Sequence, residues 1–402
     1  MSQSLESLHA RVRQEVAARS DRLWDVSLAL HREPETAYEE HRAAGLLAGE
    51  LEREGFEVER GVAGLPTAFT ARTGSADGTR DGPCAALLME YDALPLLGHA
   101  CGHNLIASAG LGAALAVRAA FGGEVEGTLL AVGTPAEERG GGKVAQVAAG
   151  LFEGVDAALM FHPGVHDWAW APLTASAQVR VGFHGRAAHP TGSPTEGIDA
   201  LGALIQLFNT LGVLSRRLPP GSHVHGIVTD GGRATNIVPD YAEGLFGLRG
   251  GTTSALEELV EELRSCAQGV ALATRTRVEV SDVGGRYEHF RDNEVLSGLF
   301  AGHLDRAGIR LSEPAPGVYL GSSDFGNVST RVPGIHPWIA VLGADGSAHT
   351  PEFAEAAAGP RARKVMLAAA EALACTAVDV LLRPDVRGRA WASLRAKAAS
   401  GQ

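Results

Sequence analysis

The sequence predicts an α/β fold in which a mostly parallel sheet, flanked by helices, is interrupted by an inserted βαββαβ unit. Helix-spaced apolar patterns alternate with short, continuous apolar runs, which is typical of parallel strands buried on both faces. Near residue 174 the strands begin instead to alternate apolar with polar side chains, and near residue 288 the first pattern returns. The 402 residues are also too many for one compact core, which favours two domains.

The larger domain is therefore expected in two parts, residues 1–174 and 288–402. Its predicted helices cover residues 5–31, 39–55, 104–121, a stretch from about Lys143, and 360–382. Its predicted strands cover residues 84–90, 127–133, 156–161 and 336–343. Helices are expected between these strands because a crossover between parallel strands needs a helix-length connection.

The inserted domain is expected over residues 175–287. Its predicted elements are a strand at 177–185, a helix at 196–214, strands at 223–230 and 236–250, a helix at 255–274 and a strand at 277–283. This βαββαβ order fits a ferredoxin-like sandwich of one sheet and two helices.

Composition narrows the classes of partner. The net charge of −12 argues against a general affinity for nucleic acid or an anionic membrane. The N-terminal residues show no secretory pattern, and the scattered Cys84, Cys101, Cys266 and Cys375 follow no disulfide spacing. We therefore expect a cytoplasmic protein.

Residues with metal-binding or acid–base chemistry follow four of the predicted strands, just beyond their carboxyl ends. They are Glu90, Asp92, Cys101, His103, Glu137, Glu138, His162 and His349. Each alone has an ordinary structural explanation, such as a buried cysteine or a solvated pair of acids. Open α/β sheets place their active sites at this edge, so the coincidence at four strand ends favours a functional site.

The residue types suit a pair of metal ions. Thiolate, imidazole and carboxylate together favour zinc, with manganese or cobalt as alternatives. Two neighbouring ions need roughly five protein ligands, and the sequence offers that number. The predicted ligands are Cys101, His103, Glu138, His162 and His349. Glu137 is left without a ligand role and is the predicted general base.

Two other readings remain open at this point. A cysteine hydrolase with Cys101 as nucleophile and a histidine as base would leave Glu138, His162 and His349 unexplained. A metal- or peptide-binding protein without activity would leave Glu137 without a purpose.

Several motifs together resemble the two-metal amidohydrolases and peptidases that include aminoacylase, folate-cleaving glutamate carboxypeptidase and carnosinase. Within them the chain is most similar to the branch of indole-acetyl-amino-acid hydrolases, p-aminobenzoyl-glutamate hydrolases and β-alanyl-lysine dipeptidases. The motifs are EYDALP (90–95), GHACGHN (98–104), GTPAEERGGGK (133–143), FHPG (161–164), GRAAHP (185–190), GGRATNIVPD (231–240), SSDFGN (322–327) and AHTPEF (348–353).

The resemblance implies a zinc-peptidase α/β domain with a lid that forms a homodimer. It implies Cys101 as the ligand that bridges the two ions and Asp92 as a residue that orients a ligand. It also implies that His189 reaches the partner subunit's site to stabilise the oxyanion, and that Asn236 and Arg249 bind the substrate carboxylate. The implied reaction is hydrolysis of the amide bond in aminobenzoyl-glutamate, β-alanyl dipeptides or N-acyl amino acids.

The chain departs from these relatives at two positions. Many distant relatives carry histidine two residues before the aspartate, where this chain has Glu90. Asparagine, Asn104, follows the motif histidine where much of the nearer branch has aspartate. The ligand set is intact, but neither the role of Glu90 nor that of His99 follows from the pattern.

Overall fold

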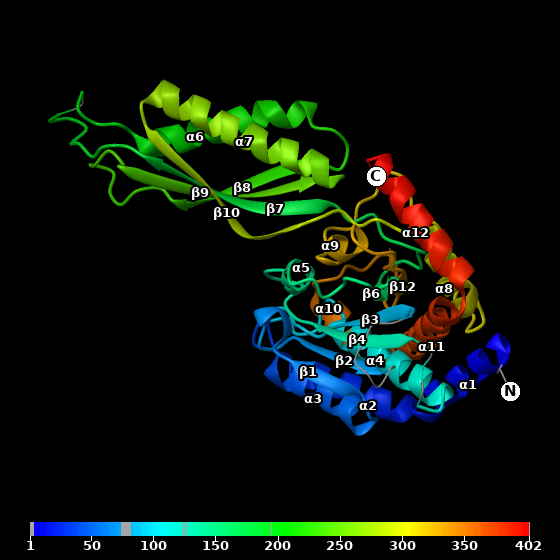
Figure 1. Cartoon of the computed structure of the whole chain (residues 1–402). Coiled ribbons are helices and arrows are strands. Elements are labelled where there is room, and N and C mark those ends of the chain that lie inside the picture. The colour runs from blue at the N-terminus through cyan, green and yellow to red at the C-terminus, as the bar shows by residue number, and fades with distance from the viewer. Residues whose placement is uncertain (1–3, 74–81, 124, 126, 194, 402) are drawn as a thin grey trace.

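The computed structural model describes residues 4–401, except 74–81, 124, 126 and 194. An α/β body carries an elongated sheet that is covered by two helices on its outer face (Figure 1). The predicted α/β class with a mostly parallel sheet is confirmed.

The body is built on a six-stranded sheet in the order β1-β2-β4-β3-β5-β11. The strands are β1 (Glu57–Arg60), β2 (Phe69–Thr73), β3 (Cys84–Glu90), β4 (Thr128–Thr134), β5 (Ala157–Leu159) and β11 (Gly334–Ile335). Strands β4, β3, β5 and β11 are parallel, whereas β1 and β2 form an antiparallel edge. This edge was not predicted, since β1 is short, charged and largely exposed.

Helices cover both faces of this sheet. They are α1 (Leu5–Ala18), α2 (Ser20–Arg32), α3 (His41–Arg53), α4 (His103–Ala120), α5 (Gly142–Ala148), α8 (Glu294–Asp305), α9 (Phe325–Ser329), α10 (Pro351–Ala356), α11 (Pro360–Leu382) and α12 (Pro384–Ala399). Helix α4 lies close on β3 because Gly110 has no side chain; a Cβ there would come within 2.9 Å of the Leu88 carbonyl oxygen. Helix α11 is apolar and long enough to cross a membrane, but 83% of its most apolar window is buried in the fold.

The helix predicted over residues 5–31 is wrong in one respect, because it is two helices. The chain leaves helical geometry at Arg19, with φ −99° and ψ 2°. The break lets each helix turn its own apolar stripe to the core. Leu8, Val12 and Val16 are buried on α1, and Leu23, Val26 and Leu30 are buried on α2.

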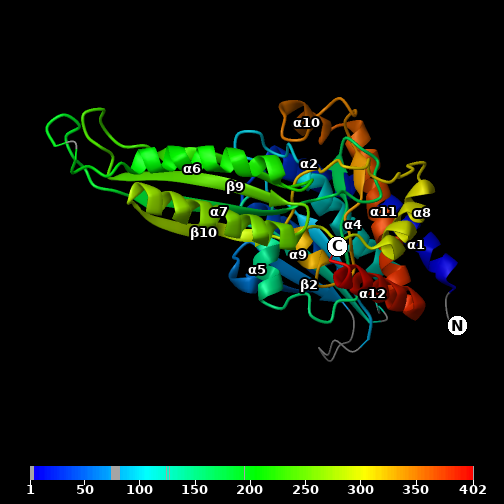
Figure 2. The same cartoon turned by 90° about the horizontal axis from the view of Figure 1, so that it is seen from above.

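The inserted unit forms a four-stranded antiparallel sheet in the order β10-β7-β9-β8. Its elements are β7 (Ala175–His184), α6 (Ala200–Leu214), β8 (His223–Asp230), β9 (Tyr241–Gly250), α7 (Thr253–Thr274) and β10 (Arg277–Tyr287). Helices α6 and α7 lie side by side along the sheet in both views (Figures 1 and 2). The buried apolar residues of this unit form a cluster of their own, separate from that of the body. We call this unit the lid; its exact boundaries, 175 and 287, stay a prediction.

Two short parallel strands lie next to the edge where the main strands end. They are β6 (His162–Gly164) and β12 (Trp338–Ala340), with His162 opposite Trp338. The predicted strand 156–161 thus ends earlier, at Leu159, and a second strand begins at His162. This pairing brings His162 to the carboxyl edge of the sheet.

Candidate metal centre

A tight turn before α4 presents Cys101 and His103. Between them Gly102 adopts a left-handed conformation with φ +77°, and a Cβ there would lie 2.5 Å from Pro163 Cγ. Glycine is therefore required both by the backbone angle and by the close approach of β6. The turn sets the two side chains against His162.

The predicted ligands form two groups that share Cys101. The donor atoms of Cys101, His103 and His162 all lie within 4.8 Å of one another. The same holds for Cys101, Glu138 and His349. Cys101 thus occupies the position that a ligand shared by two ions would need.

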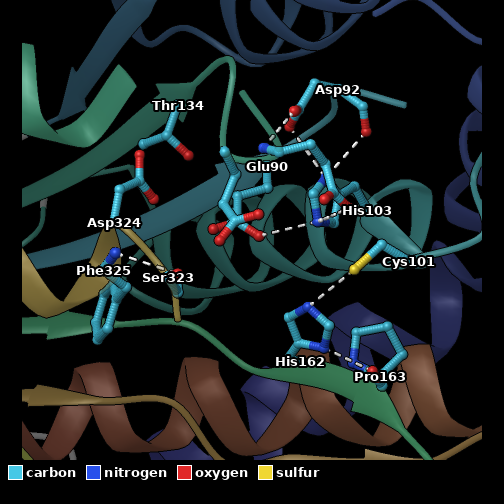
Figure 3. Close-up of polar contacts among 12 residues, drawn as sticks. Glu90, Asp92, Cys101, His103, Thr134, His162, Pro163, Ser323, Asp324 and Phe325 are labelled. Carbon is cyan, nitrogen blue, oxygen red and sulfur yellow. Dashed lines mark hydrogen bonds and ion pairs between the residues drawn. The ribbon is translucent and has the colours of Figure 1, made fainter. Parts of the chain in front are cut away.

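His162 presents its Nε2 atom to the centre. Its Nδ1 donates to the carbonyl oxygen of Pro163 at 2.6 Å, so Nε2 carries the lone pair. That lone pair faces Cys101 Sγ at 3.5 Å (Figure 3). The ring is stacked on Trp338, with 4.5 Å between centroids. Burial lowers the pKa of His162 to about 4, which keeps the ring neutral, as metal binding requires.

Asp92 orients His103 from behind the centre. Its Oδ1 accepts from His103 Nδ1 at 3.0 Å, and its Oδ2 accepts the backbone N–H of Glu138 at 2.9 Å. The opposite ring nitrogen, His103 Nε2, is buried and has no hydrogen-bond partner. A ligand is the simplest partner for such an atom, since a buried polar group left unsatisfied is costly.

His349 closes the centre on the solvent side. Its Nε2 lies 3.4 Å from Glu138 Oε1, and its side chain is 52% exposed. Its backbone N–H donates to the Ala100 carbonyl oxygen at 2.9 Å, which ties it to the turn that carries Cys101. The hydrogen bond to Glu138 raises the pKa of His349.

Glu137 lies beside the ligand groups without belonging to either of the two that share Cys101. One of its carboxylate oxygens is within 4.8 Å of donor atoms of His103 and Glu138. Burial raises its pKa well above the ordinary value, and the charges of Glu90 and Glu138 raise it further. The Tyr287 hydroxyl, at the end of β10, donates to the Glu137 carbonyl oxygen at 2.8 Å. The base is therefore held by a residue of the lid.

Lys143 and Asp324 belong to the site, although sequence reasoning gave them no role. Lys143 Nζ lies 2.6 Å from Glu90 Oε1 and 2.6 Å from Asp324 Oδ1. All three side chains are buried. Glu90 thus has a role that the sequence left open: it shares a buried lysine with Asp324, while its other oxygen lies 3.5 Å from His103 Nε2. The available signal was a lysine at the head of a buried helix, in the motif GGGK.

The centre fits divalent cations on charge as well as on donor type. Five carboxylates converge here on a single lysine ammonium. They are Glu90, Asp92, Glu137, Glu138 and Asp324. Besides His103 Nε2, Glu138 Oε1 is buried without a hydrogen-bond partner. Two cations would satisfy these atoms and offset the excess negative charge.

Cys101 does not have the surroundings of a nucleophile. Burial raises the pKa of its thiol well above the ordinary value, and the Glu138 carboxylate raises it further. A nucleophilic cysteine needs the opposite shift, whereas bound cations would stabilise the thiolate.

A cavity of about 1180 Å³ opens over the centre, between the body and the lid. Its wall includes Cys101, Glu137, Glu138, His162 and His349 from the body. From the lid it includes Ser176, Gln178 and Arg180 of β7 and Arg249 of β9. Arg249 Nη1 donates to Ser322 Oγ at 2.6 Å, so the guanidinium already faces the body.

Two predicted residues do not reach this cavity within one chain. His189 is exposed, and its Nδ1 accepts the backbone N–H groups of Thr191 and Gly192. Asn236 is exposed in the loop before β9. Neither lines the cavity. His99, in contrast, is buried near the centre, and burial lowers its pKa to about 3, but it belongs to none of the donor groups.

Comparison with known proteins gives one consistent family. Residues 89–372 match the family model described as peptidase family M20/M25/M40. The mouse Xaa-Arg dipeptidase is 39% identical over 391 residues, which cover 94% of this chain and 90% of that protein. One of the p-aminobenzoyl-glutamate hydrolase polypeptides of Escherichia coli K12 is 35% identical over 280 residues, which cover 65% of this chain and 56% of that protein.

The fold has also been solved in related proteins. The crystal structure of a dinuclear metal-binding M20 peptidase from Bacillus subtilis superposes with a TM-score of 0.68 at 22% identity. The match covers 91% of this chain and 99% of that one.

Proposed function

The chain belongs to peptidase family M20/M25/M40 and is a metal-dependent hydrolase of amide or peptide bonds; we propose that it cleaves N-acyl amino acids or dipeptides. Two divalent ions are its cofactors, and we propose zinc, with manganese or cobalt as alternatives. The observation that carries the proposal is Glu137, a buried acid beside two donor groups that share Cys101.

The proposed ligands divide between the two groups. His103 and His162 would serve one ion, Glu138 and His349 the other, and Cys101 both. When bound, the ions would polarise the amide carbonyl and make a water molecule acidic enough to be deprotonated near neutral pH. Asp92 supports this arrangement, since it fixes the ring of His103 and the backbone of Glu138 together.

Glu137 is proposed to move the proton. Its carboxylate takes a proton from the attacking water, whose oxygen adds to the amide carbon. The same proton then passes to the nitrogen of the leaving amine as the C–N bond breaks. Support comes from its place at the cavity wall and from the Tyr287 hydroxyl, which fixes its backbone.

Arg249 is proposed to bind the substrate carboxylate. Cleavage of an N-acyl amino acid or dipeptide leaves an amino acid whose α-carboxylate a guanidinium can bind with two hydrogen bonds. The names of the mouse and E. coli relatives both describe such molecules, an Xaa-Arg dipeptide and p-aminobenzoyl-glutamate. Arg249 lines the cavity from the lid side, so the substrate would lie between it and the ions.

We further propose that the chain is a cytoplasmic homodimer formed by the lid. Strand β8 is an edge strand of the lid sheet, and Ile227 and Val228 on it are 61% and 49% exposed. Exposed apolar edge strands are natural pairing surfaces. The exposed His189 and Asn236 would then reach the partner subunit's cavity, His189 for the oxyanion and Asn236 for the carboxylate.

The test is metal-dependent turnover on a defined panel of amides. The protein is stripped with a chelator, reloaded with zinc, manganese or cobalt, and assayed for amine release from N-acyl amino acids, β-alanyl dipeptides and aminobenzoyl-glutamate. Activity that returns only with metal, on at least one substrate with a free carboxylate, supports the proposal. Full activity in the stripped protein would contradict it, and metal-loaded protein that cleaves none of the panel would favour a binding protein.

A further inference from the structure

A second cluster of metal-binding side chains lies outside the catalytic centre, where three helices meet. His9 comes from α1, His303 from the last turn of α8, and Asp379 from the last turn of α11. Helix α11 packs against both α1 and α8. Residues some 370 positions apart in the sequence are thus brought to one point, and none of them belongs to the predicted catalytic ligands.

The three donor groups converge within bonding range of a single ion. His303 Nε2 lies 2.8 Å from Asp379 Oδ2, and His9 Nε2 lies 3.5 Å from Asp379 Oδ1. The two imidazole rings meet edge to face, with 4.7 Å between centroids. A tetrahedral ion with bonds of about 2 Å holds its ligand atoms roughly 3.3 Å apart, so the observed spacings lie on either side of that value.

Two of these atoms are buried and unsatisfied. His9 Nε2 and Asp379 Oδ1 point toward each other but form no hydrogen bond. The Asp379 side chain is 2% exposed, and the His9 and His303 side chains are each 12% exposed. Leaving such a pair of atoms without partners costs stability, and an ion between them would satisfy both.

We propose that His9, His303 and Asp379 form a third metal site, which binds one Zn²⁺ and ties α1 to α8 and α11. Two neutral imidazoles and one carboxylate are a usual zinc set, and a water molecule can take the fourth position. The role is structural, because no base, substrate cavity or reactive group accompanies the cluster among the described residues.

The neighbouring cation does not prevent this. Arg383 Nη1 lies 3.6 Å from Asp379 Oδ1, but Nη2 of the same guanidinium lies 3.2 Å from Asp385 Oδ2. Arg383 can therefore keep Asp385 as a partner while Asp379 turns its oxygens to the ion. The side chain of Asp385 is 60% exposed, so that pair forms without crowding the site.

The experiment counts zinc ions per chain in the untagged, full-length protein. Wild-type protein and the His9→Gln, His303→Gln double variant are loaded with Zn²⁺, freed of excess and measured by mass spectrometry of the metal. The proposal expects one ion per chain fewer in the double variant and unchanged amide hydrolysis. His184→Gln is the matched control, because His184 also pairs with a carboxylate, Glu279, but in the lid; it should lose no ion.

Thermal unfolding gives the second readout. After the catalytic sites are filled, further Zn²⁺ should raise the melting temperature of the wild type but not that of the double variant, because only a bound folded state is stabilised. Equal zinc content in the two proteins would overturn the proposal. If the double variant does not fold, the single variant His9→Gln and the wild-type count decide it: a wild type that saturates at two ions per chain has no third site.

Discussion

Lys143 and Glu90 form a buried ion pair directly behind the predicted metal ligands, with 2.6 Å between Nζ and Oε1. Asp324 shares the same ammonium, and Glu90 also approaches His103 Nε2 at 3.5 Å. The lysine therefore holds two acids that would otherwise repel each other and Glu137. The pair links strand β3 to helix α5, so the geometry of the centre depends on a charge that is not itself a ligand.

We predict that Lys143→Met destabilises the protein by about 3–5 kcal/mol, because removing one partner leaves buried carboxylates without compensation. The measurement is the free energy of unfolding in urea for the metal-free protein. Lys364→Met, on an exposed position of α11, is the matched control and should change stability by less than about 0.5 kcal/mol. Similar values for the two variants would show that Glu90 and Asp324 do not depend on the lysine.

Two adjacent glutamates are predicted to fail in different ways. Glu137→Gln should lower kcat by about 10²-fold or more, with the metal content unchanged, because the base is lost while the ligands remain. Glu138→Gln should lose bound metal, because Glu138 lies in a ligand group. Metal analysis and kcat on the same preparations separate the two. A Glu137→Gln enzyme with nearly normal kcat would remove that residue from the role of base.

Arg249→Met is predicted to lower kcat/KM by roughly 10–100-fold for substrates with a free carboxylate, since a hydrogen bond to a charged group contributes about 1.5–3 kcal/mol. The same variant should scarcely change the already slow cleavage of the corresponding carboxamide. Arg217→Met, just beyond the end of α6 and paired with Glu262, serves as the control. An equal loss on both substrates would mean that Arg249 does not read the carboxylate.

Asp379 predicts a pH-dependent stability in the metal-free protein. Burial alone would raise its pKa, but hydrogen bonds from His303 and His9 outweigh burial and hold the pKa at about 2. Because the folded pKa lies below the unfolded value, the group stabilises the protein above pH about 4, and this contribution is lost as the pH falls toward 2. Arg383 is the other charged group at this carboxylate.

The check is urea unfolding at pH 5 and pH 3 in chelator. Asp379→Asn should lose less stability than the wild type between these values, by on the order of 1 kcal/mol. Asp305→Asn removes an exposed carboxylate that pairs with Arg310 and is the control. Parallel losses in wild type and Asp379→Asn would contradict the assignment.

Much of the fold could be predicted because its strands are of two clearly different kinds. Strands β3 and β4 are buried along their whole length and are read from the sequence as continuous apolar runs. Strand β7 alternates, with Val179 and Val181 buried and Gln178 and Arg180 facing the cavity side. The antiparallel edge β1–β2 escaped, because its few residues are charged and are held mainly by pairing with β4 through β2.

The candidate ligands could be predicted because each follows a strand and has metal-binding chemistry. Lys143 and Asp324 could not, because a single lysine or aspartate is ordinarily on the surface, and only the tertiary structure brings them to Glu90. The same applies to His9, His303 and Asp379, which sequence reasoning treated as unremarkable and three helices bring together.

The dimer proposed for the lid is best tested by complementation between two inactive variants. His189→Ala lacks the residue proposed to act on the partner subunit's site, and Glu137→Gln lacks the base of its own site. In a mixed dimer the subunit with His189→Ala keeps its Glu137 and receives an intact histidine from its partner, so one of the two sites is complete. Random exchange of subunits should then restore about a quarter of wild-type activity, because about half of the dimers are mixed and each has one working site. Ile227→Lys on the β8 edge should abolish the restoration by preventing assembly, whereas Ile205→Lys, on the exposed face of α6, is the control for a new charge on the lid. Activity that stays at the level of the separate variants, in a mixture shown by sedimentation to contain mixed dimers, would mean that His189 does not act across the interface.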